Sequence, residues 1–109
     1  KTRFTIKKSN GVFLLSVNDI VFIQSHGDFL VAIDNNKNKH VINQSVSNII
    51  EMLDPKKFFQ INRSEIINVD FIQKFETHFK NKLCISLEGL KEPLYTSSSR
   101  TPDFRAWLG

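Results

Sequence analysis

Cysteine is almost missing from this sequence, and Cys84 is the only one among 109 residues. A single thiol cannot form an internal disulfide, and it excludes a zinc site built from cysteines. A chain of this length can bury a sufficient core without disulfides or metals. We therefore expect one domain, residues 1–109, folded in a reducing cytoplasm.

Long apolar runs are missing as well. No segment approaches the roughly 20 apolar residues that are needed to cross a bilayer. The first residues, 1–6, lack the apolar region of a secretory signal peptide and alternate like a strand. We expect no membrane segment in this chain.

Residue patterns for catalysis are also missing. The histidines His26, His40 and His78 are scattered without the spacing of a metal site, and the four glycines form no phosphate-binding loop. Cys84 lies in an apolar strand, where a thiol usually packs without reacting. Acidic residues do not cluster. We expect no enzyme activity, no metal and no cofactor.

The net charge of +4 comes from dispersed basic residues. Such a charge is compatible with a nucleic-acid partner, but it does not indicate one, because many basic proteins bind no anion.

The residues that are abundant predict a mainly β fold. Ten phenylalanines favour pleated, half-buried surfaces. The stretch 20–24 is too apolar for a strand with one exposed face. Alternation and turn residues predict an antiparallel meander of five short strands, at residues 3–8, 12–17, 20–24, 29–33 and 39–43.

A change of period predicts one short amphipathic helix at about residues 46–53. Ser45 is its expected N-cap, and Pro55 ends it because the residue before a proline leaves the α region. Its apolar stripe, which we expect to pack on the sheet, is Val46, Ile49, Ile50 and Leu53.

The second half returns to strands. Phe71, Phe75 and Phe79 lie on one predicted strand face, residues 83–87 form another strand, and Pro93 restricts residues 94–97 to an edge strand. Thr101 and Pro102 predict the start of a short C-terminal helix at about 102–108. The residues of this helix that we expect to cover the core are Phe104, Trp107 and Leu108.

Three turns, at residues 24–27, 60–64 and 97–100, combine small hydroxyl side chains with longer hydrogen-bonding ones. Loops on a rigid β scaffold are where binding residues accumulate. Serine, asparagine and backbone amides bind phosphates, while arginine can bond a guanine edge with two hydrogen bonds. Each residue alone has an ordinary structural explanation, such as an ion pair between Arg63 and Glu65 or a flexible serine spacer before Arg100.

The segment at residues 59–72, Phe-Gln-Ile-Asn-Arg-Ser-Glu-Ile-Ile-Asn-Val-Asp-Phe-Ile, resembles the most recognisable motif of the LytTR family. These are DNA-binding output domains of bacterial response regulators. Residues 19–23 resemble the early strand of the family, and Ser99-Arg100 resembles its closing Ser-Arg pair. The resemblance covers nearly the whole chain.

This resemblance implies an elongated, mainly antiparallel β fold whose loops enter successive major grooves of bent duplex DNA. It implies DNA contacts by His26, Arg63 and Arg100, with Asn62 and Ser98 beside them. We expect both arginines to read base edges, His26 to add a hydrogen bond, and Asn62 and Ser98 to bind phosphates. It also implies paired direct repeats as the target, and an upstream receiver or sensor domain for which this chain is the C-terminal output module.

Two basic residues, Lys80 and Lys82, are possible contacts to the DNA backbone, although a solvated turn explains them more simply. We assign Ser64 and Asn68 to holding the turn through bonds from side chain to backbone. Two other classes stay open: a protein-interaction module that pairs through a sheet edge, and an RNA-binding β domain. The second would need exposed aromatic residues to stack on bases, whereas most phenylalanines fit core faces in the sequence pattern.

Overall fold

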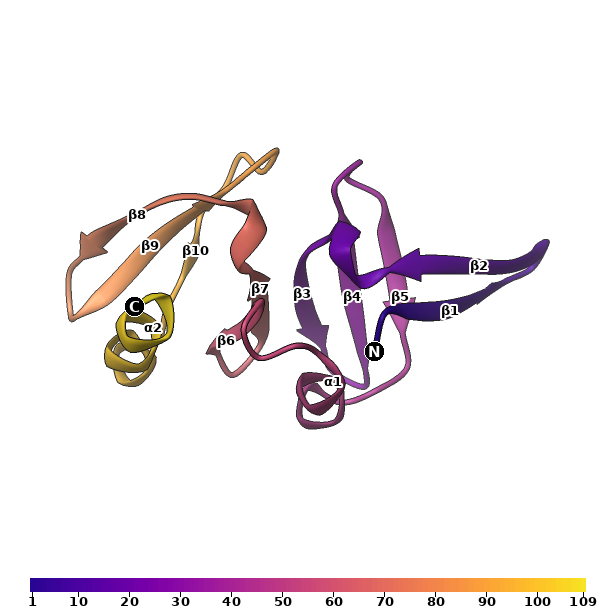
Figure 1. Cartoon of the computed structure of the whole chain (residues 1–109), viewed down its shortest axis with the longest axis horizontal. Helices are drawn as coiled ribbons and strands as arrows, with labels where there is room; N and C mark the ends of the chain where they lie inside the picture. Colours follow the sequence, from indigo (N-terminus) through magenta and orange to yellow (C-terminus); the bar gives the residue numbers. More distant parts are fainter.

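The computed structural model describes residues 1–109 as an elongated β fold that measures 46 × 26 × 25 Å (Figure 1). Ten strands form three antiparallel sheets of two, five and three strands. The strands of the first half are β1 (Arg3–Lys8), β2 (Gly11–Ser16), β3 (Ile20–His26), β4 (Phe29–Asp34) and β5 (Lys39–Ile42). Those of the second half are β6 (Phe58–Asn62), β7 (Glu65–Asn68), β8 (Ile72–His78), β9 (Lys82–Leu87) and β10 (Leu94–Tyr95). The helices are α1 (Val46–Met52) and α2 (Thr101–Leu108), with short 3₁₀ turns η1 (Val17–Asp19), η2 (Val69–Phe71) and η3 (Ser98–Arg100).

The central five-stranded sheet, in the order β5-β4-β3-β7-β6, is covered on both faces. Its strand β3 shows why: Ile20 to Ile23 are all buried, and their side chains divide between two separate hydrophobic clusters. A strand with cores on both sides reads as a continuous apolar run, so the interpretation of residues 20–24 is confirmed.

One face of the central sheet packs against α1 and the β1–β2 hairpin. Ile49 and Leu53 are buried in this first cluster, together with Phe4, Ile6 and Leu15 of the hairpin. The hydroxyl of Ser45 accepts a hydrogen bond from the backbone N–H of Asn48 at 3.2 Å, which confirms the predicted N-cap.

The other face packs against the sheet β10-β9-β8 and α2. The alternation predicted for residues 83–87 is confirmed, because Leu83, Ile85 and Leu87 are buried here. Phe104 of α2 is fully buried, with its ring edge-on to those of Phe59 and Phe75. This cluster fixes α2, and therefore η3 at its start, beside β6.

Three details of the sequence interpretation are wrong. The first five strands are not one meander, since β1 and β2 form a separate hairpin and β3 pairs with β4 and β7 instead. Helix α2 begins one residue early, with Arg100 rather than Thr101 as its N-cap. Leu108 is exposed, and only five of the ten phenylalanines are buried. The other five lie in β2, β4, η2, β8 and the β8–β9 turn, where part of the side chain faces solvent because β2 and β8 are largely uncovered.

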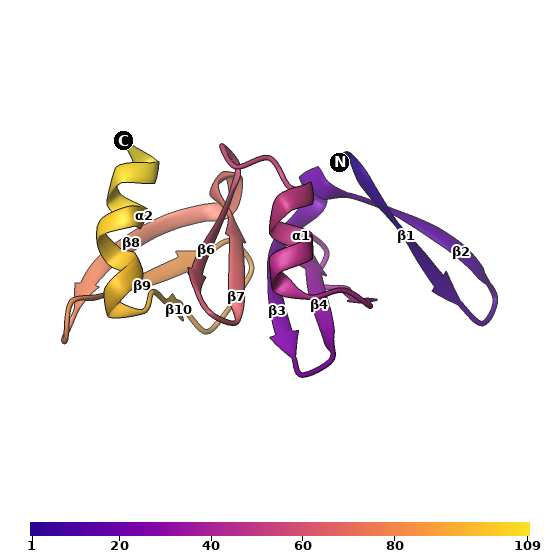
Figure 2. The ribbon, with the colours of Figure 1, turned by 90° about the horizontal axis from the view of Figure 1, so that it is seen from below.

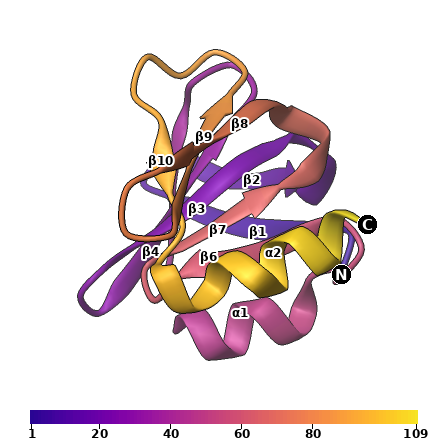
Figure 3. The same ribbon diagram turned by 90° about the vertical axis from the view of Figure 1, so that its left-hand side faces the viewer.

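The hairpin turns lie along one side of the molecule. Figure 2 shows the turns of β1–β2, β3–β4, β6–β7 and β8–β9 at the lower side, where α2 also begins. Viewed from the α2 end, the β3–β4 and β6–β7 turns project away from the sheets beyond the start of α2 (Figure 3). No helix of the chain is long and apolar enough to span a bilayer.

Candidate functional site

Arg63 lies at the tip of the two-residue turn that joins β6 to β7. Asn62 and Glu65 pair across this turn, and the side-chain oxygen of Asn62 accepts a hydrogen bond from the backbone N–H of Ser64 at 2.9 Å. Asparagine often closes turns in this way. The side chain of Arg63 is exposed and makes no hydrogen bond or ion pair within the chain, so the ion pair with Glu65 considered above does not form. Its five N–H donors are free for a ligand.

Arg100 ends η3 and is held in place by three contacts. Its Nε donates to the carbonyl oxygen of Gln60 at 2.9 Å, and its Nη1 donates to Asp103 at 2.9 Å. The guanidinium carbon lies 4.4 Å from the centre of the Phe59 ring. These contacts leave donors on the guanidinium unused while they fix its plane.

The two arginines line the same open depression, which we call the arginine depression. Ser97 donates its backbone N–H to the carbonyl oxygen of Ile61 at 3.0 Å, which ties the segment before η3 to the β6–β7 hairpin. All seven residues that line the depression are polar, and none carries a carboxylate: Gln60, Asn62, Arg63, Ser64, Ser97, Ser99 and Arg100. Only the guanidinium of Arg100 has a carboxylate partner, Asp103, which does not line the depression, so the two arginines together favour an anionic, hydrogen-bonding ligand.

His26 ends β3 and belongs to a hydrogen-bonded network that reaches the arginine depression. Its Nε2 lies 2.9 Å from the side-chain oxygen of Gln24, whose nitrogen donates to Glu65 at 2.7 Å. Glu65 also accepts from Asn62 at 3.0 Å, and Asn62 in turn donates to the carbonyl oxygen of Tyr95 at 2.8 Å. The three turns predicted from sequence are therefore brought together: Glu65 joins the turns at 24–27 and 60–64, and bonds from Ser97 and Arg100 to β6 hold the third turn beside them.

The β8–β9 turn, which carries Lys80, lies next to the same surface. The hydroxyl of Ser98 donates to the carbonyl oxygen of Lys80, so η3 and this turn are in direct contact. Lys82 shares a shallow depression with Asn62 and Ser97. The turn therefore adjoins the site rather than lying on a distant surface.

Tyr95 lies where these depressions meet, opposite Cys84 on β9. A hydrogen bond with the Cys84 thiol raises the pKa of the Tyr95 phenol above its ordinary value. A tyrosine phenol is neutral near pH 7, so its hydroxyl can donate a hydrogen bond.

Sequence reasoning missed the central role of Glu65 and assigned turn closure to the wrong residue. Asn62, not the hydroxyl of Ser64, closes the turn, whereas Asn68 is structural as predicted: it donates to the carbonyl oxygen of Ile20 at 2.8 Å. The partners of Glu65 come from β3 and β6, and the register that aligns Gln24 with Glu65 is visible only in the folded sheet. The Asn-x-x-Glu spacing across a two-residue turn was the one local signal available.

Comparison with protein families agrees with this arrangement. The family model described as the LytTr DNA-binding domain matches residues 10–109. The chain belongs to the LytTR family. This LytTR domain is therefore a DNA-binding domain by family, and the resemblance read from residues 59–72 is confirmed.

A solved structure shows the same fold over the whole LytTR domain. It is the LytTr DNA-binding domain of a protein from Bacillus cereus described as a methyl-accepting/DNA response regulator. The TM-score is 0.89 at 19% identity, and the match covers 100% of this chain and 98% of that one. It thus includes β1, which precedes the residues matched by the family model.

A curated relative of this LytTR domain is a considerably longer protein. An uncharacterized response regulatory protein of Vibrio cholerae serotype O1 is 26% identical over 94 residues. The match covers 82% of this chain but 36% of the relative, so the chain spans little more than a third of that protein.

Proposed function

We propose that this LytTR domain binds double-stranded DNA sequence-specifically, with its turns in successive major grooves, as the output domain of a bacterial transcription regulator. The observation that carries the proposal is the arginine depression, where Arg63 and Arg100 face one space with no carboxylate between them. Arginine bonds the O6 and N7 of guanine with two donors, and the major groove is where that pattern is displayed.

The contacts of the two arginines support a different role for each in this proposal. Arg63, which is exposed and without internal partners, reaches into the groove and reads bases. Arg100 is fixed by Gln60 and Asp103, so it presents its remaining donors in a set orientation to a base edge or a phosphate. His26, exposed at the end of β3, adds a hydrogen bond from the neighbouring turn.

Two residues expected to bind phosphates have a different role in this proposal. Both amide hydrogens of Asn62 are donated, to Glu65 and to Tyr95, and the hydroxyl of Ser98 is donated to Lys80. A phosphate needs donors, so these side chains organise the site. Ser97 and Ser99, Lys80 and Lys82 are better placed to contact the backbone, because the serines line the arginine depression and the lysines adjoin it.

The target and the context follow from the same proposal. A single domain of this size covers a short site, so two copies on paired direct repeats would form the functional complex. The longer response regulatory relative supports an upstream receiver or sensor domain in the complete protein, which would act in the cytoplasm.

The test is a titration of the domain with a duplex selected from a random pool. Arg63→Ala is expected to weaken binding to that duplex by about 1–3 kcal/mol, which is roughly 5- to 150-fold, and to relax base preference at one position. Arg105→Ala, which removes an exposed arginine from α2, is the matched control and should bind like the unmodified domain. Equal affinities of Arg63→Ala and the unmodified domain would refute the role of Arg63.

A competition between duplex DNA, single-stranded DNA and RNA separates this function from the other two classes. The exposed rings of Phe79 and Tyr95 could stack on unpaired bases, and β8 is an unpaired sheet edge that could accept a partner strand. Preference for the duplex, with strong salt dependence, is the expected result. Preference for RNA, or capture of a protein without any response to salt, would favour one of the alternatives.

A further inference from the structure

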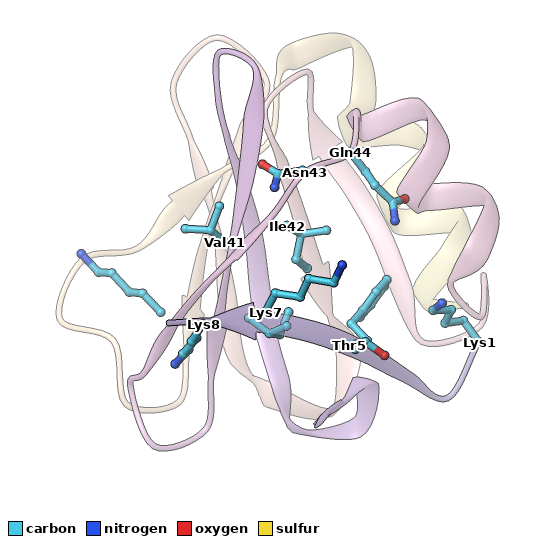
Figure 4. Close-up of a pocket in the computed structure, with 11 residues that line it drawn as sticks. Lys1, Thr5, Lys7, Lys8, Val41, Ile42, Asn43 and Gln44 are labelled. Carbon is cyan, nitrogen blue, oxygen red and sulfur yellow. The ribbon is translucent and has the colours of Figure 1, made fainter. Parts of the chain in front are cut away.

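The β1–β2 hairpin forms one wall of a second basic depression, which we call the lysine pocket (Figure 4). Residues 1–18, which contain this hairpin, hold four basic residues and no acidic one. Four lysines line the pocket, from the N-terminus, β1 and β5: Lys1, Lys7, Lys8 and Lys39. The other polar residues that line it, Thr5, Asn43 and Gln44, carry no charge.

The lysines have no carboxylate partner. None of the four ion pairs in the structure includes a lysine of the pocket. Lys1 and Lys8 lie over phenylalanine rings of the same hairpin, 5.3 Å from the centre of Phe4 and 4.9 Å from that of Phe13. Uncompensated ammonium groups around amide and hydroxyl side chains provide a surface that favours a polyanion over a cation.

The hairpin is an arm whose base is anchored in the core. Its inner residues Phe4, Ile6 and Leu15 are buried in the first hydrophobic cluster, and Val17 donates its backbone N–H to the carbonyl oxygen of Thr2 at 3.0 Å. Lys7 and Lys8 lie beyond these buried residues, and the pairing of β1 with β2 sets the position of their backbone next to the turn. Ordered donors lose less conformational entropy on binding than donors on a flexible tail.

The arm is directed toward the side of the molecule that carries the proposed DNA interface. Its turn lies on the same side as those of β3–β4 and β6–β7 (Figure 2). In Figure 4 the amine of Lys7 points from β1 toward the strand that bears Ile42 and Asn43. Lys39 provides a link, since it lines both the lysine pocket and the shallow depression that contains His26.

We propose that the lysine pocket binds the phosphate backbone of the same duplex, outside the base pairs read by the arginine depression. This inference rests on the proposed function. The long axis of 46 Å matches about 14 base pairs at 3.4 Å each, so a duplex along the row of turns reaches the hairpin. The lysines then contribute to affinity but not to sequence preference.

The experiment compares Lys7→Gln/Lys8→Gln with Lys56→Gln/Arg105→Gln in a titration by fluorescence anisotropy. Both double variants remove two positive charges. Lys56 lies in the connection from α1 to β6, on the opposite side of the molecule from the row of turns (Figure 2). Glutamine keeps most of the side-chain length, and unchanged thermal unfolding by circular dichroism will confirm that each variant is folded.

On a selected duplex of about 30 base pairs, the hairpin variant is expected to bind about 10- to 30-fold more weakly at 0.15 M salt. The slope of log affinity against log salt should be smaller by about 2, while the base preference is unchanged. The control variant should show neither change. The duplex is then shortened at each end in turn. The difference between the hairpin variant and the unmodified domain should disappear when the end that contacts the hairpin is removed, and should persist when the other end is removed.

Each other outcome is decisive. If the hairpin variant matches the control in affinity and slope while Arg63→Ala still binds more weakly, the lysine pocket is not a DNA contact and the proposed function stands. If the hairpin variant changes the oligomeric state rather than the salt slope, the surface binds a second copy and the inference is wrong. If the unmodified domain shows no salt-dependent binding to any duplex, both proposals fail.

Discussion

At the residue scale, Arg63 and Arg100 share one depression but differ in what holds them. Arg63 has no partner within the chain, whereas Arg100 bonds Gln60 and Asp103 and lies over the ring of Phe59. In the proposed complex we expect the free arginine to adapt to a base edge and the fixed one to set the register of the contact. The two residues therefore have separable effects on binding and on stability.

Arg100→Ala is expected to lower the free energy of unfolding by about 1–3 kcal/mol, because it removes charge-assisted hydrogen bonds and a cation–π contact. Arg63→Ala should change that free energy by less than about 0.5 kcal/mol, as is usual for an exposed side chain without partners. Urea unfolding of both variants, followed by circular dichroism, measures the difference. An equal loss in both variants would contradict the distinction drawn between them.

Asp34 predicts a pH dependence of stability. Burial raises the pKa of this carboxyl, but hydrogen bonds from His40 and from the backbone N–H groups of Asn38 and Asn36 outweigh it and keep the pKa below its ordinary value. A carboxyl with a lowered folded pKa stabilises the fold above the ordinary carboxyl range, and this stabilisation is lost as pH falls below about 4.

The matching variant is Asp34→Asn. It should be less stable than the unmodified domain at pH 7, and its unfolding free energy should fall less steeply between pH 5 and pH 2. Urea unfolding at a series of pH values gives both quantities. An unchanged pH profile would mean that Asp34 does not contribute to acid sensitivity.

At the element scale, the turns after β3 and β6 are coupled through Glu65, which begins β7. Its carboxylate accepts from Gln24 and from Asn62, and the backbone N–H of Ser25 donates to the carbonyl oxygen of Ser64 at 2.7 Å. The negative charge of Glu65 should repel the phosphates of DNA. A structural role is therefore needed to explain why a carboxylate lies in this basic surface. The network supplies that role, because it fixes His26 relative to the β6–β7 turn that carries Arg63.

We therefore expect Glu65→Ala to weaken duplex binding by about 1 kcal/mol, or roughly fivefold, although it removes a negative charge from the interface. Glu65→Gln keeps one acceptor oxygen and the side-chain length, so its affinity should be intermediate. Anisotropy titrations at one salt concentration measure both. Tighter binding by Glu65→Ala would show that charge outweighs positioning at this residue.

At the scale of the whole molecule, the modest net charge of +4 is distributed unevenly in space. The basic residues of the arginine depression, the β8–β9 turn and the lysine pocket have no ion-pair partner, with the exception of Arg100, which pairs with Asp103. The ion pairs of Lys57 and Lys74 neutralise charge elsewhere. We therefore expect local clustering, rather than net charge, to attract a polyanion.

The turns and their flanks are expected to contact about four to six phosphates. The slope of log affinity against log salt for the unmodified domain should then be about −4 to −5 on a selected duplex. Raising salt from 50 to 200 mM would weaken binding several hundredfold on that basis. A titration series in potassium chloride measures the slope, and a flat response would contradict a DNA interface on this side of the molecule.

Local sequence predicted much of this structure, because the signals act over short distances. Ser45 and Asn68 satisfy nearby backbone groups, and the alternation at Leu83, Ile85 and Leu87 reports burial directly. The segment at residues 59–72 was specific enough to indicate the family, which the family match then confirmed. The candidate residues Arg63 and Arg100 were likewise chosen for their chemistry and their place in turns.

Only the tertiary structure decided which segments, far apart in the sequence, lie next to one another. Gln24 lies beside Glu65, Arg100 beside Gln60, and Lys39 lines one pocket with Lys7, through sheet register and helix packing that no short window encodes. The sequence by itself determined the elements and the chemistry of their turns, because propensity and periodicity are local. Side-by-side placement of those turns required the two hydrophobic cores, since burial on both faces of the central sheet is what aligns them.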